Sequence, residues 1–231
     1  MSKPCVAVIL AGGAGLRMGG GKPMRAWGNV SLVGRALTLA RGYADEVAVA
    51  VRDAEQLGGG VGTPLLLDRP DIPGPLAGLA SALAFARARG AARVQVLACD
   101  MPRLPLDLAA RLAAGIEFRA QVGLPASNGR LHPVCGLWSV EVESLLADYL
   151  AQGRSSLRGL AAAAGEAVVD WGTIQPDPFI NLNTLNELSA QQPSASELTR
   201  VKAVRVGLGE TAGWESTEAA GRRANHTSHS S

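Results

Sequence analysis

The chain has 231 residues, of which 47% are apolar, and its formal net charge at pH 7 is +2. This length and apolar content suit one α/β domain with a substantial core. The near-neutral charge, without a basic stripe, argues against a nucleic-acid-binding protein. No apolar stretch reaches the roughly 18 residues of a membrane span, and the N-terminus lacks a signal-peptide pattern, so we expect no membrane partner and a cytoplasmic location.

Short apolar runs alternate with helical patterns along the first hundred residues. The runs that predict strands are Cys5–Leu10, Glu46–Val51, Pro64–Leu67 and Arg93–Ala98. Between them, Leu32–Arg41 and Pro75–Arg89 carry alanine and leucine at helical spacing, and Gly90 ends the second helix. The alternation predicts a single three-layer, Rossmann-like α/β domain whose central sheet is mostly parallel, with helices on both faces.

The region from Phe118 to Trp138 has a different pattern. Two extended runs flank Ser127-Asn128-Gly129, a turn signal typical of a β-hairpin. We therefore expect a small antiparallel insertion or edge there, able to cover a second substrate. The remaining predicted elements are helices at Val142–Ala151 and Ser156–Ala164, strand-like runs at Ala167–Trp171 and Phe179–Leu182, and a last helix containing Glu187 and Leu188.

The composition changes near residue 190. Residues 191–231 are rich in Ser, Thr, Gly, Ala and charged residues, and Val201–Leu208 is the only strand candidate among them. We place the folded domain at residues 1–190 and expect residues 191–231 to be a disordered or loosely docked tail.

The loop after the first predicted strand carries the strongest functional signal. From Leu10 to Lys22 it contains six glycines, and Arg17 and Lys22 add positive charge. Glycine lets backbone N–H groups approach an anion closely, so the loop predicts a polyphosphate site. A Walker A loop is excluded because Pro23 follows Lys22 where a hydroxyl residue is required, and the dinucleotide fingerprint fails at Met18. The pattern is similar to the signature loop of nucleotidyltransferases that release pyrophosphate.

Asp100 follows the predicted strand Arg93–Ala98. An unpaired buried carboxylate costs several kcal/mol, so Asp100 must meet a cation. A Mg²⁺ ion that also binds triphosphate oxygens fits, because Mg²⁺ uses one or two carboxylates together with substrate phosphates. The alternative is an N-cap for a helix starting near Leu106, a role that Asp107 fills at least as well.

Two further polar groups follow predicted strands. Asp68 and Asp71 lie before the helix that starts at Pro75, and either could accept hydrogen bonds from a guanine edge or a ribose; ordinary turn chemistry is the alternative. Asn181 and Asn183 point the same way from an extended segment and could hold a ligand phosphate or complete a metal shell. Helix capping explains one of these two asparagines but not both.

The remaining candidates carry weaker signals. His132 lies in the predicted antiparallel region and could contact a second substrate or be structural. The three cysteines, Cys5, Cys99 and Cys135, lie far apart without metal-ligand spacing, so we expect buried reduced thiols.

Taken together, these motifs resemble the molybdenum cofactor guanylyltransferases (the MobA family of nucleotidyltransferases), which join GMP to molybdopterin. The residues that carry the resemblance are Leu10–Lys22, Gly74–Gly78, Cys99–Pro102, His132-Pro133 and Phe179–Thr184. They occur in the family's order and span Cys5 to about Leu188. The resemblance implies Mg-assisted in-line transfer of GMP from GTP to the terminal phosphate of molybdopterin, with release of pyrophosphate.

The resemblance also implies partners and site residues. GTP and molybdopterin would be the substrates, Mg²⁺ the cofactor, and molybdoenzymes or their chaperones the recipients of the product; we expect a monomer or a weak homo-oligomer. Arg17, Lys22 and Asp100 would be catalytic, and Asp100 would hold the metal. Nucleotide binding would fall to Leu10, Gly12, Gly13, Lys22, Asp68 and Asp100, with Asp68 at the guanosine. Asn181 and Asn183 would face the second substrate.

Two positions depart from the family's pattern. Gly21 stands before the lysine where an acidic residue is usual, and this puts the positioning of Lys22 in question. Leu185 follows Thr184 where proline is usual, which affects only a helix start.

Three other functions compete with guanylyl transfer. The related cytidylyltransferases tend to read Leu-Ala-Ala-Gly, whereas this chain has glycine at position 12, which favours guanine. Sugar-1-phosphate nucleotidyltransferases are usually longer. A non-catalytic cofactor- or nucleotide-binding protein has no need for Arg17, Lys22 and Asp100 together.

Overall fold

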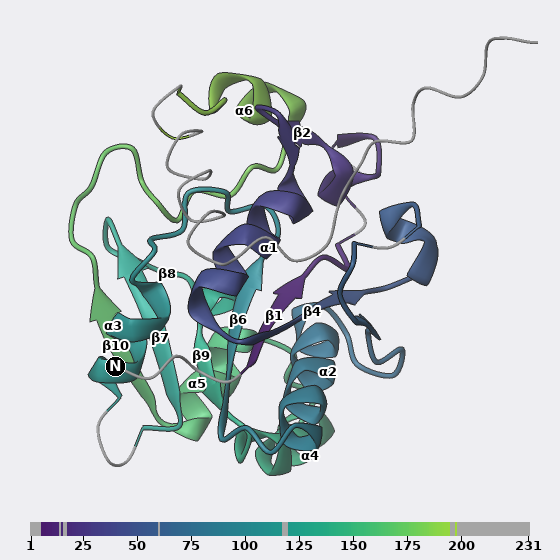
Figure 1. The fold of residues 1–231 in the computed structure, drawn as a ribbon. Coiled ribbons are helices and arrows are strands. Elements are labelled where there is room, and N and C mark those ends of the chain that lie inside the picture. The colour runs from purple at the N-terminus through teal and green to yellow at the C-terminus, as the bar shows by residue number, and fades with distance from the viewer. Residues whose placement is uncertain are drawn as a thin grey trace, which may run out of the picture.

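The computed structural model describes residues 6–13, 15, 18–59, 61–116, 120–194 and 197. Within this part of the chain, eight strands form the central sheet (Figure 1). The strands are β1 Val6–Leu10, β4 Glu46–Val51, β5 Leu65–Leu67, β6 Arg93–Ala98, β7 Val122–Ser127, β8 Arg130–Leu131, β9 Leu137–Ser139 and β10 Glu166–Asp170. Their order is β10-β7-β9-β6-β1-β4-β5, with β8 paired to β7.

The middle of the sheet is parallel. β1 pairs with β4 on one side and β6 on the other, and Val8 lies opposite Ala48 and Val96. β1 is apolar throughout, and β4 and β6 are mostly apolar, because both faces of the sheet are covered, as in other parallel sheets. The predicted α/β fold with a mostly parallel sheet is confirmed.

Helices cover both faces of this sheet. They are α1 Leu32–Tyr43, α2 Pro75–Ala88, α3 Leu108–Gly115, α4 Val142–Ala151 and α5 Leu157–Ala164, whereas α6 Leu185–Ala190 packs in a separate core. The core that contains Ala7 and Ile9 includes residues of α1 and α3, whereas the core that contains Val6 and Val8 includes residues of α2, α4 and α5. Alternate residues of β1 therefore face different helical layers, which gives the predicted three layers.

Local capping explains where several helices begin. The Ser31 side chain accepts a hydrogen bond from the Gly34 N–H at 3.1 Å at the start of α1. Pro75 is the first residue of α2, where its missing N–H costs nothing. Thr184 and Glu187 form a capping box at α6, so the helix starts without the usual proline at Leu185.

A small third core joins two segments that matter for the site. Met18, Trp27, Leu32, Leu182 and Leu188 pack together, and the first four of them are fully buried. Trp27 belongs to the hairpin of β2 Ala26–Trp27 and β3 Val30–Ser31. α6 and β2 lie side by side at one end of the molecule (Figure 1). This core fixes the end of the glycine-rich loop relative to the segment before α6.

The region predicted as an antiparallel insertion is part of the main sheet. Its turn is correct, since Asn128 and Gly129 both have positive φ, at 49° and 72°. β9, however, lies between β6 and β7 and pairs antiparallel with both. The sheet therefore continues through this region to β10, and the antiparallel strand is internal to it.

The later part of the chain differs from its predicted pattern at residues 179–182. The strand-like run Phe179–Leu182 is wrong as a strand, because these residues form a loop. Of the predicted tail, the structure describes residues 191–194 and 197, and the strand candidate Val201–Leu208 lies outside the described residues. The boundary at residue 190 stays a prediction.

No helix in the described ranges is long and apolar enough to cross a membrane.

Candidate active site

The candidate site is a cleft of about 330 Å³ at the carboxyl ends of four neighbouring parallel strands. The residues that directly follow these strands line it: Ala11, Gly12 and Gly13 after β1, Arg52 after β4, Asp68 after β5, and Cys99 and Asp100 after β6. Ligands of open α/β sheets bind at this edge, where the loops diverge.

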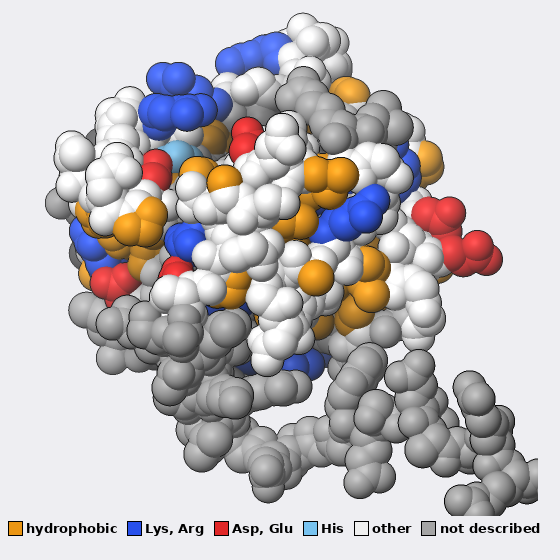
Figure 2. Space-filling model, turned by 90° about the horizontal axis from the view of Figure 1, so that it is seen from above, with side chains coloured by type: hydrophobic (Ala, Val, Ile, Leu, Met, Phe, Trp, Pro, Cys, Tyr) orange, Lys and Arg blue, Asp and Glu red, His pale blue; other side chains and the backbone are white. Residues whose placement is uncertain are grey.

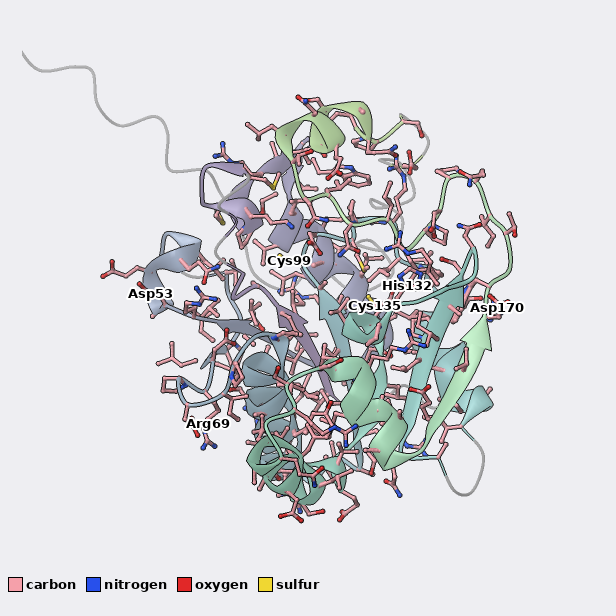
Figure 3. The ribbon with its side chains drawn as sticks, turned by 180° about the vertical axis from the view of Figure 1, so that it is seen from behind. Asp53, Arg69, Cys99, His132, Cys135 and Asp170 are labelled. Atoms are coloured by element: carbon pink, nitrogen blue, oxygen red, sulfur yellow. The ribbon has the colours of Figure 1, made fainter. Side chains whose placement is uncertain are left out.

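Cys99, which lines the cleft, lies between two groups of labelled side chains in Figure 3. Figure 3 shows Cys99 between Asp53 and Arg69 on one side and His132, Cys135 and Asp170 on the other. Figure 2 shows the same end of the molecule from outside, with lysine and arginine side chains in separate groups rather than a stripe.

Lys22 brings three predicted motifs together. It begins the short helix η2 Lys22–Met24, directly after Gly21, whose φ is 60°. Its Nζ lies 2.5 Å from Asp100 Oδ2 and donates to Asn183 Oδ1 at 2.9 Å. The Lys22 and Asp100 side chains are only 12% and 13% exposed. Three segments therefore meet at Lys22: the glycine loop, the end of β6 and the Asn-x-Asn segment. The sequence predicts a cation next to Asp100, and in the structure Lys22 supplies one.

Asp100 keeps one oxygen without a partner. Oδ1 is buried and makes no hydrogen bond with the described residues. The helix that follows, α3, has Asp107 at its N-cap position, so Asp100 is not that cap. A carboxylate with one engaged and one free oxygen fits a divalent cation that takes its other ligands from substrate phosphates. The described residues contain no group of three or more His, Cys, Asp or Glu side chains that could hold a metal alone.

Asp68 forms the wall at the other end of the cleft. A Cβ added at Gly12 would overlap Asp68 Oδ2, and one added at Gly78 would lie 3.2 Å from Asp68 Oδ1. Burial raises the pKa of Asp68, against the opposing effect of nearby Arg52, and Oδ1 is buried without a partner. The glycine at position 12 is thus required for this carboxylate to lie against the loop.

The structure separates the two aspartates that the sequence left open. Asp71 pairs with Arg69 at 3.2 Å, and these side chains are 62% and 57% exposed. Asp71 therefore belongs to ordinary turn chemistry, and Asp68 is the candidate for recognising a base or ribose.

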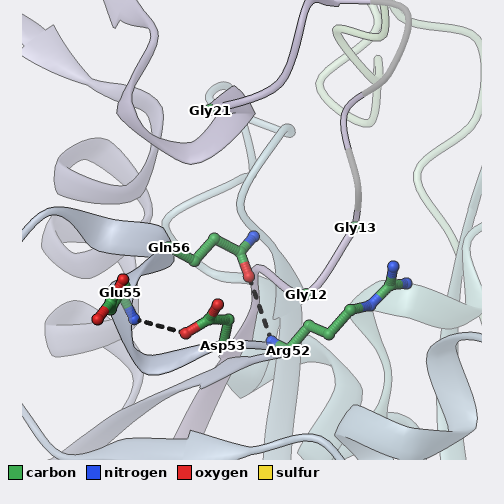
Figure 4. A pocket seen from close by; sticks show the side chains of 7 residues that line it. All are labelled: Gly12, Gly13, Gly21, Arg52, Asp53, Glu55 and Gln56. Carbon is green, nitrogen blue, oxygen red and sulfur yellow. Dashed lines mark hydrogen bonds between the residues drawn. The ribbon is translucent and has the colours of Figure 1, made fainter.

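Arg52 and Gln56 are candidate site residues that sequence reasoning missed. They line a second pocket beside Gly12, Gly13 and Gly21 (Figure 4). Gln56 Nε2 donates to the Ala11 carbonyl at 2.5 Å, and Gln56 Oε1 accepts from the Arg52 N–H at 3.2 Å, which fixes the start of the glycine loop. Arg52 lines both pockets. Its position directly after β4 was the signal that could have identified it.

The other predicted site residues lie as follows. Leu10, Gly12, Gly13, Lys22, Asp68, Asp100 and Asn181 all line the cleft. Asn183 contacts Lys22. Arg17 lies outside the described residues. At Gly21 an added Cβ would meet nothing within 4 Å, so the absent acidic side chain leaves open space, while the positive φ favours glycine.

Cys99 and Cys135 are buried free thiols, as predicted, while Cys5 lies outside the described residues. Burial raises the pKa of each of these two thiols to about 12. They are therefore protonated and unreactive at neutral pH, and Cys99 contributes a wall of the cleft.

Sequence comparisons agree with this geometry. Residues 7–168 match the family described as the MobA-like NTP transferase domain. A molybdenum cofactor guanylyltransferase from Nitrobacter hamburgensis is 34% identical over 201 residues, which are 84% of this chain and 95% of the relative. One from Cereibacter sphaeroides is 36% identical over 183 residues, 79% of this chain and 92% of the relative.

Two solved structures share the fold. The molybdopterin-guanine dinucleotide biosynthesis protein A from Archaeoglobus fulgidus has a TM-score of 0.63 and 20% identity, with 85% of this chain and 99% of that one covered. The 2-C-methyl-D-erythritol 4-phosphate cytidylyltransferase from Thermus thermophilus has a TM-score of 0.59 and 19% identity, with 84% and 98% covered. With most of its length matched by family and relatives alike, the chain belongs to the MobA-like NTP transferase family.

Proposed function

We propose that this nucleotidyltransferase moves GMP from GTP to the terminal phosphate of molybdopterin and releases pyrophosphate. The observation that carries the proposal is the meeting of Lys22, Asp100 and Asn183 at one side of a cleft whose other end is formed by Gly12 and Asp68. The relatives that match most of the chain are named molybdenum cofactor guanylyltransferases, which supports this substrate pair.

The reaction is an in-line displacement at phosphorus. A terminal phosphate oxygen of molybdopterin attacks the α-phosphorus of GTP, and the bond from that phosphorus to the β-phosphate oxygen breaks. The attacking phosphate is already largely ionised at neutral pH, because its second pKa is about 6, so the protein needs no general base. Its work is to position the two substrates and to neutralise negative charge.

Three parts of the chain would do this work. Gly12, Gly13 and Lys22 line the cleft, and the backbone N–H groups of the two glycines and the ammonium of Lys22 would favour the negative charge of a triphosphate. Asn181 and Asn183 offer amide groups to the second substrate or its phosphate. Arg17, in the same loop, would add a further cation.

The donor set fits a magnesium ion, since Asp100 has a free buried oxygen at the cleft. Asp100 would hold the ion, which when bound neutralises charge on the triphosphate oxygens. Lys22 balances the charge of Asp100 in the structure as described.

Asp68 would select the base. Its carboxylate accepts hydrogen bonds but donates none when ionised. Guanine offers a ring N–H and an amino group side by side, whereas cytosine offers one amino group next to an unprotonated ring nitrogen. This chemistry favours GTP over CTP.

The test is pyrophosphate release with Mg²⁺ and molybdenum-loaded molybdopterin, with GTP and CTP compared. Release with GTP alone is expected. Release with CTP alone would assign the cytidylyl reaction, and GTP binding without release would support a non-catalytic binding protein.

A further inference from the structure

Ser127, His132 and Asp177 form a hydrogen-bonded group that the proposed reaction leaves without a role. Ser127 is fully buried at the end of β7, and His132 is 8% exposed. The Ser127 hydroxyl donates to Asp177 Oδ1 at 2.8 Å and lies 2.9 Å from His132 Nε2. A hydroxyl has one hydrogen to donate, so Ser127 Oγ accepts from His132 Nε2–H, which fixes the tautomer of the imidazole.

This group is not a nucleophilic triad. In such a triad the histidine lies between the serine and the carboxylate. Here the serine is in the middle, and its hydroxyl is buried. The arrangement connects segments of the chain rather than activating an oxygen.

The segment it holds is the loop between β10 and α6. Asp177 Oδ1 also accepts from the Phe179 N–H at 2.9 Å. The Phe179 ring stacks on His132, with ring centroids 4.8 Å apart and 13° between the planes. The turn residue Asn128 accepts from the Ile174 N–H at 3.3 Å. The hairpin of β7 and β8 therefore anchors the loop at residues 174–179.

The same loop enters the cleft directly after this anchor. Asn181 lines the cleft. The Leu182 N–H donates to the Asp100 carbonyl at 3.0 Å, and Asn183 Oδ1 accepts from Lys22. One residue separates Phe179 from Asn181, so the anchored loop runs directly into the segment that carries the asparagines.

His132 is also close in the chain to a second lining segment of the cleft. It directly precedes the short helix η4 Pro133–Cys135, and its carbonyl accepts from the Cys135 N–H at 3.0 Å. Val134 of this helix lines the cleft. The group thus connects two segments that line the cleft, one at Val134 and one at Asn181.

We propose that Ser127, His132 and Asp177 are positioning residues for the transfer step, which hold residues 181–183 in place against Lys22 and Asp100. The catalytic part of this inference rests on the proposed function; the anchoring of the loop does not. Misplacing a site group by about 1 Å can cost roughly 10²-fold in rate, so loss of the anchor is expected to lower turnover strongly.

A purely structural role makes a different prediction. Gly12 and Asp68 lie at the opposite end of the cleft and belong to other elements. Loss of positioning lowers kcat and leaves the Kd for GTP unchanged, whereas general destabilisation lowers Tm and reduces the fraction of protein that binds GTP.

The first experiment compares Ser127→Ala and Asp177→Ala with conservative variants. Asp177→Asn keeps an oxygen that accepts from Ser127 and Phe179, and His132→Gln keeps a side-chain N–H donor. We expect kcat to fall roughly 10- to 100-fold in the alanine variants and to recover in large part in the conservative ones. Tyr149→Phe is the matched control. Tyr149 belongs to α4, at the other end of the sheet (Figure 1), and the change removes a hydroxyl that donates to the Ser156 carbonyl at 3.0 Å.

A double variant tests whether the group acts through Asn183. Residues that act as one unit are not additive, so Ser127→Ala combined with Asn183→Ala should lose no more activity than Asn183→Ala alone. Full additivity of the two losses would overturn the proposal. If Ser127→Ala does not fold, Asp177→Ala is combined with Asn183→Ala instead, because Asp177 is only half-buried.

Hydrogen exchange on the full chain without substrates gives a readout that does not depend on activity. In Ser127→Ala and Asp177→Ala, peptides covering residues 177–183 should exchange faster, while those covering β1 and α2 should not change. Unchanged exchange at 177–183 would refute the anchoring. If the unaltered protein transfers no GMP, the proposed function fails, and this exchange result still decides whether the group anchors the loop.

Discussion

Lys22 and Asp100 are 78 positions apart in the sequence, yet Lys22 Nζ lies 2.5 Å from Asp100 Oδ2. Both side chains are largely buried, and each neutralises the charge of the other. Without its partner, either one would be an uncompensated buried charge. A triphosphate in the cleft offers Lys22 a second anionic partner, and a metal offers Asp100 a second cationic one. The same two charges that pair with each other in the folded cleft are therefore the ones that would bind its ligands.

Replacing Lys22 with alanine should lower turnover by roughly 10²- to 10³-fold, the scale for losing one fixed electrostatic contact. Initial rates of pyrophosphate release measure the effect. Arg41→Ala, which removes a cation from the exposed end of α1, is the matched control. A Lys22→Ala enzyme with near-normal rates would reject this role for Lys22.

Asp100→Ala should abolish Mg²⁺-dependent activity, because it removes the cleft carboxylate that we propose to hold the metal ion. Calorimetry of GTP binding provides a second readout. Mg²⁺ should strengthen GTP binding to the unaltered protein and have no effect on the variant. Full activity of Asp100→Ala at ordinary Mg²⁺ concentrations would remove the metal role.

Asp68→Asn should weaken GTP binding by roughly 10- to 100-fold, since a hydrogen bond to a charged group contributes about 1.5–3 kcal/mol. Binding of CTP should change far less. Asp71→Ala is the control, because Asp71 is exposed and its ion pair is with the exposed Arg69. Equal losses for GTP and CTP would show that Asp68 does not select the base.

The same Asp68→Asn change should raise the stability of the ligand-free protein. Burial raises the pKa of Asp68 above its ordinary value of 3.8, so its ionised form costs free energy in the folded state. That cost is fully present at neutral pH and is relieved as the pH falls through the raised pKa toward 3.8. The Tm difference should therefore be largest near pH 7 and shrink in acid. A lower Tm for the variant at neutral pH would contradict this reading.

The sequence predicts most of the sheet because buried strands and helices have regular apolar patterns. β4, β6 and α4 have the predicted bounds. The run at Phe179–Leu182 misleads because its two buried apolar residues pack into different cores, Phe179 with Trp171 and Leu182 with Trp27. Tertiary packing thus buries apolar residues of a loop, and the sequence alone does not distinguish such a short apolar run from a strand.

Site residues can be nominated from the sequence, but their contacts cannot. The glycine loop, Asp100 and the paired asparagines are visible as motifs, and their proximity follows from where parallel strands end. The Lys22–Asp100 ion pair and the Ser127–His132–Asp177 group join residues far apart in the chain, so only the fold reveals them. The roles assigned to these residues, and the recipients of the product, stay predictions.

The most direct test of guanylyl transfer follows GTP labelled at its α-phosphorus. With Mg²⁺ and molybdenum-loaded molybdopterin, the label should appear in a molybdopterin guanine dinucleotide while unlabelled pyrophosphate is released, and Lys22→Ala should suppress both. Label that remains in GTP, or that appears only as free GMP, would contradict the transfer of GMP to molybdopterin.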